Sequence, residues 1–140
     1  YRGYWSDMTR TVVLGKASER QKEIYHVVAG AQERVRQSIR PGMTGWEADI
    51  IAREYITDAG YGEEFGHGLG HGLGMEMHEA PRLAQREEGK IVLQPGMVAT
   101  DEPGIYIAGF GGVRIEDDLV IREGGCEVLN TSTKELLELS

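Results

Sequence analysis

Glycine alternates with other residues through the middle of the chain, where residues 66–79 read Gly-His-Gly-Leu-Gly-His-Gly-Leu-Gly-Met-Glu-Met-His-Glu. Glycine at every second position disfavours a helix and weakens a strand, because each glycine loses backbone entropy and contributes no packing. A chain accepts this cost where its backbone bends sharply or comes close to a ligand. The stretch also holds three of the four histidines, His67, His71 and His78. It therefore indicates either a glycine-rich loop with solvated histidines or a metal or catalytic site.

Composition limits the class of protein. The chain of 140 residues is 40% hydrophobic and 27% charged, as is typical of a single globular domain. No apolar run is long enough to span a membrane, and the net charge of −8 argues against a nucleic-acid partner. The single cysteine, Cys126, cannot form an internal disulfide, which favours a reducing, cytoplasmic compartment.

Two capping boxes predict two helices. Ser18 is followed three positions later by Gln21, and Thr44 in the same way by Glu47, the pattern that satisfies free amides at a helix N-terminus. Apolar residues at helical spacing follow each box, and we expect both helices to cover a sheet. These residues are Ile24, Val27, Val28, Ala31, Val35 and Ile39 in the first helix and Trp46, Ala48, Ile50, Ile51, Tyr55 and Ile56 in the second.

Turn residues separate several short β-rich runs elsewhere in the chain. The expected strands are Thr9–Leu14, Met97–Asp101, Val113–Ile121 and Cys126–Leu129. A polar surface loop is expected at Arg82–Lys90 and a terminal helical turn at Lys134–Leu139. One strand, two helices and then several mostly antiparallel strands predict an α+β fold.

Two glutamates occupy unusual positions. Glu102 ends one expected strand and Glu116 lies inside another, although an unpaired charge in apolar surroundings costs several kcal/mol. If the chain folds back near Gly109, residues equidistant from Gly109 face each other, and these two glutamates do so. They would repel unless a cation lay between them. The alternative is that one strand lies at an edge and its glutamate is solvated.

Asp7, just before the first expected strand, is a third candidate ligand. Carboxylates combined with imidazole suit Mn²⁺, Fe²⁺, Co²⁺ or Zn²⁺. Several carboxylates with few histidines also favour a pair of bridged ions, which can activate a water and polarise a carbonyl together. His67 and His78 would then be left to move protons or orient a substrate.

Five blocks of sequence, in register over almost the whole chain, carry a resemblance. They are Tyr-Trp-Ser-Asp-Met-Thr-Arg-Thr at 4–11, His-Gly-Leu-Gly-His-Gly-Leu-Gly at 67–74, Met-His-Glu-Ala-Pro at 77–81, Glu-Pro-Gly-Ile-Tyr at 102–106 and Gly-Val-Arg-Ile-Glu-Asp-Asp at 112–118. Together they resemble the pita-bread metallopeptidases of family M24, specifically the branch of Xaa-Pro aminopeptidases and Xaa-Pro dipeptidases (prolidases). The resemblance implies the C-terminal portion of a pita-bread catalytic domain, with two helices covering a curved sheet.

The resemblance also implies a metal site. Asp7 and Glu116 would bridge two divalent ions in the complete domain, and His71 and Glu102 would complete the shell of one of them. Manganese is expected first, with cobalt, zinc or iron as alternatives. Arg114 matches an arginine beside the metal carboxylates and would support them from outside the ligand shell.

The implied reaction is hydrolysis of the peptide bond between an N-terminal residue and a proline at the second position. His67 and His78 match catalytic histidines that contact substrate and assist proton transfer, while Glu102 is the expected general base for a metal-activated water. A homodimer is expected for the full-length protein. The residues leave open whether the enzyme is an aminopeptidase or a dipeptidase.

One departure from the family pattern concerns the second ion. The family has a further aspartate ligand upstream of the block at 4–11, and a preceding half-domain related to the second half by pseudo-symmetry. We therefore expect 1–140 to be a single, partial catalytic domain that binds metal weakly and is inactive alone. The alternatives are a metal-free pita-bread module that binds proteins and a creatinase-like hydrolase, both disfavoured by the four retained ligands.

Overall fold

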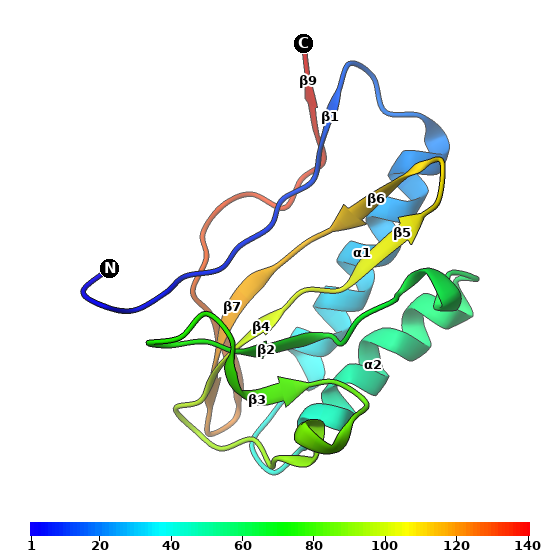
Figure 1. Cartoon of the computed structure of the whole chain (residues 1–140). Coiled ribbons are helices and arrows are strands. Elements are labelled where there is room, and N and C mark those ends of the chain that lie inside the picture. Colours follow the sequence, from blue (N-terminus) through cyan, green and yellow to red (C-terminus); the bar gives the residue numbers. More distant parts are fainter.

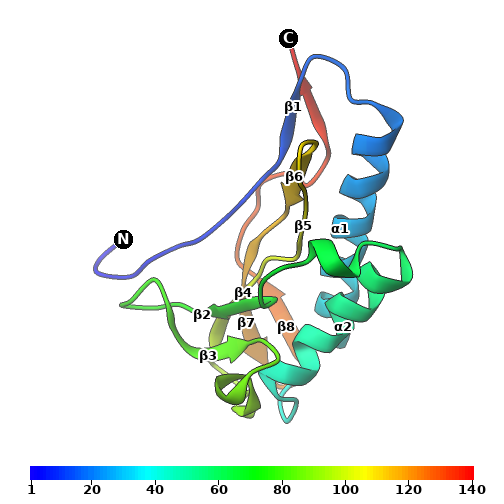
Figure 2. The ribbon, with the colours of Figure 1, turned by 45° about the vertical axis from the view of Figure 1, so that its right-hand side comes forward.

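The computed structural model describes all 140 residues of the chain. Two helices, α1 (Glu19–Ser38) and α2 (Gly45–Asp58), lie side by side and cover one face of the sheet (Figure 1, Figure 2). Each begins with the predicted capping box, in which Ser18 or Thr44 exchanges hydrogen bonds with the residue three positions on. These bonds satisfy amides that the first turn of a helix leaves without partners.

Nine strands and two short 3₁₀ helices make up the rest of the regular structure. The strands are β1 (Val12–Leu14), β2 (Gly70–Gly72), β3 (Glu79–Leu83), β4 (Val98–Asp101), β5 (Gly104–Ile107), β6 (Gly111–Arg114), β7 (Asp117–Arg122), β8 (Gly125–Val128) and β9 (Leu137–Leu139), and the 3₁₀ helices are η1 (Gly62–Glu64) and η2 (Glu87–Lys90). The main sheet has five antiparallel strands in the order β3-β2-β4-β7-β8. Strands β5 and β6 form a separate antiparallel pair, and β1 and β9 a parallel one. The predicted α+β class, with two helices over a mostly antiparallel sheet, is confirmed.

The helices and the sheet enclose one apolar core of 19 buried residues. Val28, Ala31 and Val35, from the predicted stripe of α1, are completely buried, as are Leu119 and Ile121 of β7. Each fully buried valine, leucine or isoleucine contributes about 1.5–3 kcal/mol. The apolar stripe thus fixes which face of the sheet α1 covers.

The chain folds back at Gly109, whose φ of +74° falls in the left-handed region that glycine tolerates. Gly104 of β5 pairs with Arg114 of β6, and Val98 of β4 pairs with Val120 of β7. Residues equidistant from Gly109 therefore face each other along the whole hairpin, as predicted.

The single strand expected at Val113–Ile121 is interrupted. Strand β6 ends at Arg114 and β7 begins at Asp117, so Glu116 lies in the gap between them. On the opposite side of the gap, Pro103 has no N–H with which to continue the ladder. The pairs β5–β6 and β4–β7 therefore keep the same register, and the ladder of hydrogen bonds is interrupted between them.

The helical turn expected at Lys134–Leu139 is wrong, because Leu137–Leu139 forms β9 and pairs in parallel with β1. The alternation of leucine and glutamate suits a strand. The Glu138 carboxylate accepts hydrogen bonds from Lys16 Nζ (2.6 Å) and from the Ala17 amide (2.9 Å). These contacts join β9 to the chain that follows β1, and sequence spacing alone does not reveal them.

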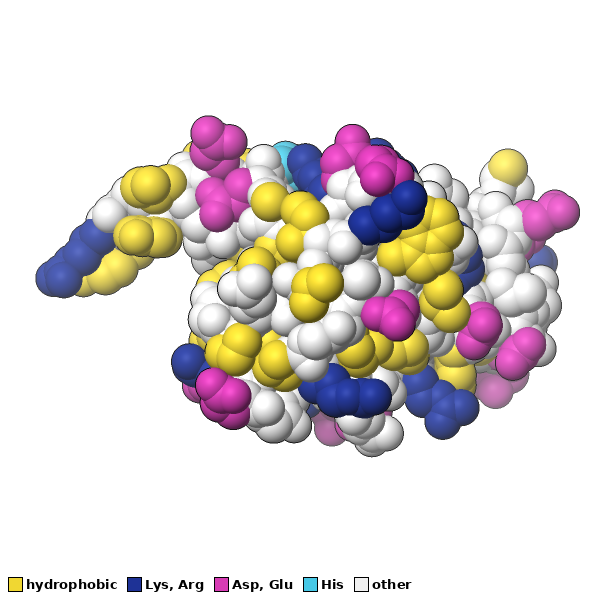
Figure 3. All heavy atoms as spheres, turned by 90° about the horizontal axis from the view of Figure 1, so that it is seen from below, with side chains coloured by type: hydrophobic (Ala, Val, Ile, Leu, Met, Phe, Trp, Pro, Cys, Tyr) yellow, Lys and Arg dark blue, Asp and Glu magenta, His cyan; other side chains and the backbone are white.

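The first strand is shorter than the expected Thr9–Leu14. Only Val12–Leu14 forms β1, and Thr9 makes an isolated bridge to Glu116. Upstream of this bridge, the N-terminal segment projects from the body of the molecule (Figure 3). Tyr4 and Trp5 in this segment are more than half exposed.

The surface loop expected at Arg82–Lys90 is only partly correct, because Arg82 and Leu83 belong to β3 and Leu83 is completely buried. Alternating glycines allow β2 to lie close to both of its neighbours. A Cβ on Gly70 would lie 2.1 Å from the carbonyl oxygen of Thr100, and one on Gly72 would lie 2.2 Å from that of Ala80. Backbone packing is therefore one reason for the glycine pattern. No helix combines the length and apolar character needed to cross a membrane.

Candidate metal centre

Two other segments of the chain form backbone hydrogen bonds with the hairpin where its ladder is interrupted. The Glu102 amide donates to the carbonyl oxygen of Leu69 at 2.9 Å, and the Glu116 amide donates to that of Thr9 at 3.1 Å. Leu69 leads into β2, and Thr9 ends the N-terminal segment. Each glutamate amide therefore pairs with a different segment, which brings further polar side chains to the same face of the sheet.

Asp7, His71 and Glu116 converge at this point, with ligand atoms all within 4.8 Å of one another. His71 Nε2 lies 3.9 Å from Asp7 Oδ2 and 3.2 Å from Glu102 Oε1. The structure thus brings together the four residues predicted to bind metal, with Glu102 joined to the other three through His71. The two glutamates that the hairpin was expected to place face to face are both here.

The His71 ring has a fixed orientation. Its Nδ1 lies 3.0 Å from the carbonyl oxygen of Gly72, and since a carbonyl only accepts, Nδ1 carries the proton. Nε2 is then the atom that faces Asp7 and Glu102. Burial alone lowers the pKa of His71, but its hydrogen bonds to Glu102 and Gly72 and the charge of Glu102 raise the pKa overall. Nε2 donates to the Glu102 carboxylate here, and loss of that proton would free its lone pair for a metal ion among the carboxylates, as in a metal-ligating imidazole.

The carboxylates at the site influence one another. Burial, reinforced by the charges of Glu102 and Asp7, raises the pKa of Glu116 to about 7, against the opposing hydrogen bond from Thr9 and the charge of Arg114. For Glu102, burial raises the pKa, but hydrogen bonds from His71 and Thr100 lower it overall. Ionising all three carboxylates together is therefore costly, and a divalent cation would remove that cost.

Hydrogen bonds from outside the cluster hold its members in place. Thr100 Oγ1 accepts from the His71 amide and donates to Glu102 Oε1, both at 3.0 Å. The Asp7 amide donates to Asp118 Oδ2 at 3.2 Å. Sequence reasoning did not identify Thr100 or Asp118, since a threonine in a strand carries no signal of its own. Their roles follow only from the register of β4 with β2 and β7.

Arg10 also supports the centre. Its guanidinium donates to the Glu116 carbonyl oxygen and to Asp117 Oδ1, each at 2.7 Å. Asp117 is completely buried and accepts a second bond from Lys134 Nζ at 2.5 Å. Arg10 lies three positions after Asp7, so a side-chain period of two does not place both on one face, and the sequence alone does not reveal this role of Arg10.

The two remaining histidines of the glycine-rich stretch have different neighbours. His67 Nε2 is 2.9 Å from the Tyr106 hydroxyl, and Arg114 donates to the same hydroxyl at 3.3 Å and to Thr9 Oγ1 at 3.0 Å. The exposed His78 has its ring centroid 4.2 Å from that of His71. Arg114 thus lies beside the carboxylates, with its Nε 3.8 Å from Glu116 Oε2.

A cavity of about 280 Å³ opens beside the cluster. All three histidines of the glycine-rich stretch line it, together with Glu102 and three arginines, Arg82, Arg86 and Arg114. The sequence prediction had placed Arg82 and Arg86 in a surface loop and assigned them no function. Three guanidinium groups make the cavity suitable for a ligand that carries an anionic group.

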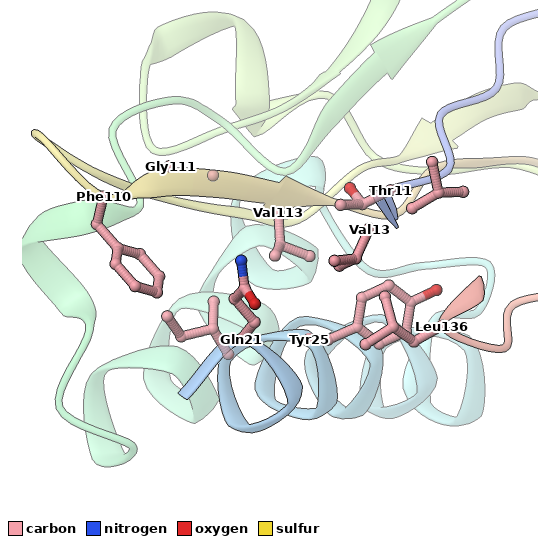
Figure 4. Close-up of a pocket in the computed structure, with 11 residues that line it drawn as sticks. Thr11, Val13, Gln21, Tyr25, Phe110, Gly111, Val113 and Leu136 are labelled. Atoms are coloured by element: carbon pink, nitrogen blue, oxygen red, sulfur yellow. The ribbon is translucent and has the colours of Figure 1, made fainter. Parts of the chain in front are cut away.

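A second hollow, of about 100 Å³, lies between α1, β1 and the β5–β6 hairpin (Figure 4). Its walls are mostly apolar, with Val13, Tyr25, Phe110 and Leu136 among the residues that surround it. No carboxylate, histidine or cysteine lines this hollow. Hydrolytic or metal chemistry is therefore supported only at the histidine-lined cavity.

The donor set fits a divalent transition metal. Three carboxylates and one neutral imidazole present oxygen and nitrogen atoms within ion-binding reach, and no thiolate is near. Manganese, iron, cobalt and zinc all accept such ligands. The raised pKa of Glu116, to which burial and the charges of Glu102 and Asp7 contribute, is the second observation in favour of this fit.

The chain is similar in sequence and fold to known proteins. The chain is 53% identical over 137 residues to an Xaa-Pro dipeptidase of Pyrococcus furiosus, covering 98% of this chain and 39% of that protein. A solved Xaa-Pro dipeptidase from Bacillus anthracis superimposes with a TM-score of 0.96 at 55% identity, covering 99% of this chain and 39% of that one. A solved X-Pro aminopeptidase from Thermotoga maritima has a TM-score of 0.95 at 44% identity, with the same coverage.

The chain therefore spans about two-fifths of the length of the relatives that it matches, 39% in each of these three cases. The family model described as metallopeptidase family M24 matches residues 1–123, which include every residue of the metal-ligand cluster. The chain belongs to metallopeptidase family M24.

Proposed function

We propose that the protein hydrolyses the peptide bond between an N-terminal residue and proline, with divalent metal at the Asp7–His71–Glu116 cluster. The convergence of these ligand atoms within 4.8 Å is the observation that carries the proposal. Relatives named Xaa-Pro dipeptidase, at about half identity across nearly the whole chain, support the choice of bond. The activity is proposed for the full-length gene product, since this chain spans 39% of those relatives.

In this proposal Asp7, His71, Glu102 and Glu116 hold the metal. A bound divalent ion supplies Lewis-acid polarisation of the scissile carbonyl and lowers the pKa of a coordinated water. Glu102, whose pKa is lowered overall although burial opposes this, is ionised at neutral pH and accepts the proton of the attacking water. Thr100 keeps the Glu102 carboxylate oriented for this transfer through its hydroxyl.

The two non-ligand histidines contact the substrate in this scheme. His67 carries its proton on Nδ1, because Nδ1 lies 2.7 Å from the carbonyl oxygen of Gly68. Its Nε2 then accepts from the Tyr106 hydroxyl, so Tyr106 helps to orient the His67 ring, which lines the cavity. His78, exposed and next to the His71 ring, is the group from which the leaving amine takes a proton.

The arginines favour a dipeptide over a longer peptide. Arg82, Arg86 and Arg114 line the same cavity as the histidines, and guanidinium groups bind carboxylates through paired hydrogen bonds. In an Xaa-Pro dipeptide the free carboxylate lies one residue from the scissile bond, within reach of such a wall. We propose Xaa-Pro dipeptidase activity for this reason.

The test compares three substrates on the full-length protein loaded with Mn²⁺. Ala-Pro is expected to be cleaved faster than Ala-Pro amide or Ala-Pro-Ala. Only in Ala-Pro does the proline itself carry the free carboxylate that the arginines can bind. Faster cleavage of the tripeptide would indicate an aminopeptidase. No bound transition metal by mass spectrometry, and no gain in activity on adding Mn²⁺, would overturn the peptidase function altogether.

Three finer properties also belong to the proposal. Manganese is proposed as the native ion from the oxygen-rich ligand set, and the choice is checked by metal analysis of protein from cells grown without supplements. A cytoplasmic location is proposed from the single, free Cys126. A homodimer is proposed for the full-length protein, with sedimentation equilibrium as its measurement.

A further inference from the structure

The segment that carries His67 has no strand or helix to hold it. Residues 66–68 lie between η1 and β2 and make no backbone–backbone hydrogen bond. Yet His67 must hold one orientation if its ring is to meet Tyr106 at 2.9 Å. Side chains must therefore hold this segment in place of backbone hydrogen bonds.

An ion pair on α2 fills this role. Asp49 is completely buried, and Arg53, one turn further along the helix, donates Nε to Asp49 Oδ2 at 2.8 Å and an Nη atom to Asp49 Oδ1 at 3.0 Å. The same guanidinium donates to the carbonyl oxygens of Phe65 at 2.8 Å and His67 at 2.7 Å. Every hydrogen bond that Arg53 makes beyond Asp49 is thus to the segment that carries His67.

The Asp49 carboxylate holds the other end of the same segment. It accepts from the Leu69 amide at 2.8 Å and from Gln85 Nε2 at 3.0 Å. The Arg53 guanidinium also stacks over the Phe65 ring, 4.3 Å from its centroid. The pair therefore fixes the backbone on both sides of His67, at residues 65 and 69.

This backbone placement determines the state of the His67 ring. Nδ1 of His67 donates to the carbonyl oxygen of Gly68 at 2.7 Å, which leaves Nε2 free to accept from Tyr106. If the backbone of residues 65–69 moved, the carbonyl that selects this tautomer would move with it. The orientation and the tautomer of His67 thus depend on one ion pair on α2, whose aspartate is buried and whose arginine is partly exposed.

We propose that Asp49 and Arg53 are positioning residues for the proposed peptidase reaction, which fix the tautomer and direction of His67. The pair meets the metal centre only at Leu69, whose amide donates to Asp49 and whose carbonyl oxygen accepts from the Glu102 amide. His71 itself is fixed by the β2 ladder and by Thr100, and Glu116 by Thr9 and Arg10. The proposal rests on the proposed function for its effect on turnover, and on geometry alone for its effect on His67.

Arg53→Lys is the decisive variant, because it keeps the positive charge beside Asp49 but removes the planar fork that reaches Asp49 and two carbonyls together. Asp49→Asn is the second variant, which keeps the side-chain shape and removes the charge. Arg34→Met is the matched control. Arg34 is exposed on α1 and lies over the Tyr55 ring, away from residues 65–69.

The first measurement is the ¹⁵N spectrum of the imidazole nitrogens in the ¹⁵N-histidine-labelled, metal-free chain. In the wild type His67 is expected as the Nδ1–H tautomer. In Arg53→Lys and Asp49→Asn its nitrogen shifts are expected to move towards those of the exposed His26, while those of His71 stay unchanged. A folded Arg53→Lys chain with unchanged His67 resonances would overturn the proposal, whatever the protein catalyses.

The second measurement uses Mn²⁺ and Ala-Pro with the full-length protein. Arg53→Lys is expected to retain Mn²⁺ affinity and to lose roughly a hundredfold in kcat/KM, the usual result of misplacing a positioned group. A purely structural pair would instead lower Mn²⁺ affinity and thermal stability together, and that result would also overturn the proposal. A wild-type protein without Xaa-Pro activity would refute the proposed function, and the tautomer measurement would still decide on Asp49 and Arg53.

Discussion

Glu116 makes the metal-free protein sensitive to pH in a predictable way. Burial and the charges of Glu102 and Asp7 raise its pKa from 4.5 to about 7, so the folded protein binds a proton that the unfolded chain has already released. The gap between 4.5 and about 7 corresponds to about 3 kcal/mol. The sign follows from linkage: the stability is present below the unfolded pKa and is lost as pH rises through the folded one.

The matched variant is Glu116→Gln, which keeps the shape and the acceptor for Thr9 but cannot ionise. In the presence of a chelator, urea unfolding of the wild type is expected to lose about 3 kcal/mol more than the variant between about pH 4 and pH 8. Subtracting the free energy of unfolding of the variant from that of the wild type cancels the contributions of His71 and the other carboxylates. Adding Mn²⁺ at the upper pH should restore the wild type and not the variant, because a cation favours the ionised carboxylate.

The reasoning about Glu116 would be refuted by two results. One is an equal pH dependence of the wild type and Glu116→Gln. The other is a wild type that gains stability relative to Glu116→Gln as the pH rises from about 4 to about 8. Either result would mean that burial and the charges of Glu102 and Asp7 do not raise the pKa of Glu116, and the electrostatic case for a cation at this site would be lost.

Three further predictions concern the site and the strand that carries it. His71→Ala is expected to lose Mn²⁺ binding in calorimetry, whereas His78→Ala should keep Mn²⁺ and lose about a hundredfold or more in turnover; equal loss of metal in both would contradict the division of roles. Chain 1–140 alone should bind Mn²⁺ weakly and leave Ala-Pro intact, and two tightly bound ions with Ala-Pro cleavage would show that no upstream aspartate is needed. Gly70→Ala, whose Cβ would lie 2.1 Å from the Thr100 carbonyl oxygen, should lose about 1–3 kcal/mol or more in thermal unfolding, while Gly66→Ala, which meets nothing within 4 Å, should stay within about 0.5 kcal/mol of the wild type.

The elements that the sequence predicted well are those set by local interactions. The capping boxes at Ser18 and Thr44 place the helix starts correctly, because a cap and its partner are three residues apart. The apolar stripe of α1 correctly predicts its buried face. The fold-back at Gly109 is also local, since a left-handed turn between two β-rich runs leaves only one register.

The elements that were mispredicted depend on distant partners. Residues 137–139 have a pattern short enough for either a helical turn or a strand, and the choice is made by β1, more than a hundred residues earlier in the chain. Similarly, Arg82 reads as part of a polar loop until β2 pairs with it through His71. Asp49 and Arg53 read as an ordinary helical ion pair, because spacing along α2 does not show which carbonyls lie above it.

The metal centre combines the two kinds of information. Symmetry about Gly109 predicts that Glu102 and Glu116 approach each other, and this could be read from the sequence. It does not predict that the ladder opens between them, which requires that each glutamate amide find another acceptor. Leu69 and Thr9 supply those acceptors, and each is two residues from a further metal-ligand candidate, His71 in one segment and Asp7 in the other. Because a side-chain period of two places residues i and i+2 on one face, the bonds that satisfy the broken ladder also direct the imidazole and the third carboxylate towards the glutamates. The break in the hairpin is therefore the physical cause of the ligand cluster, and an uninterrupted strand from 113 to 121 would have left the glutamates without His71 and Asp7.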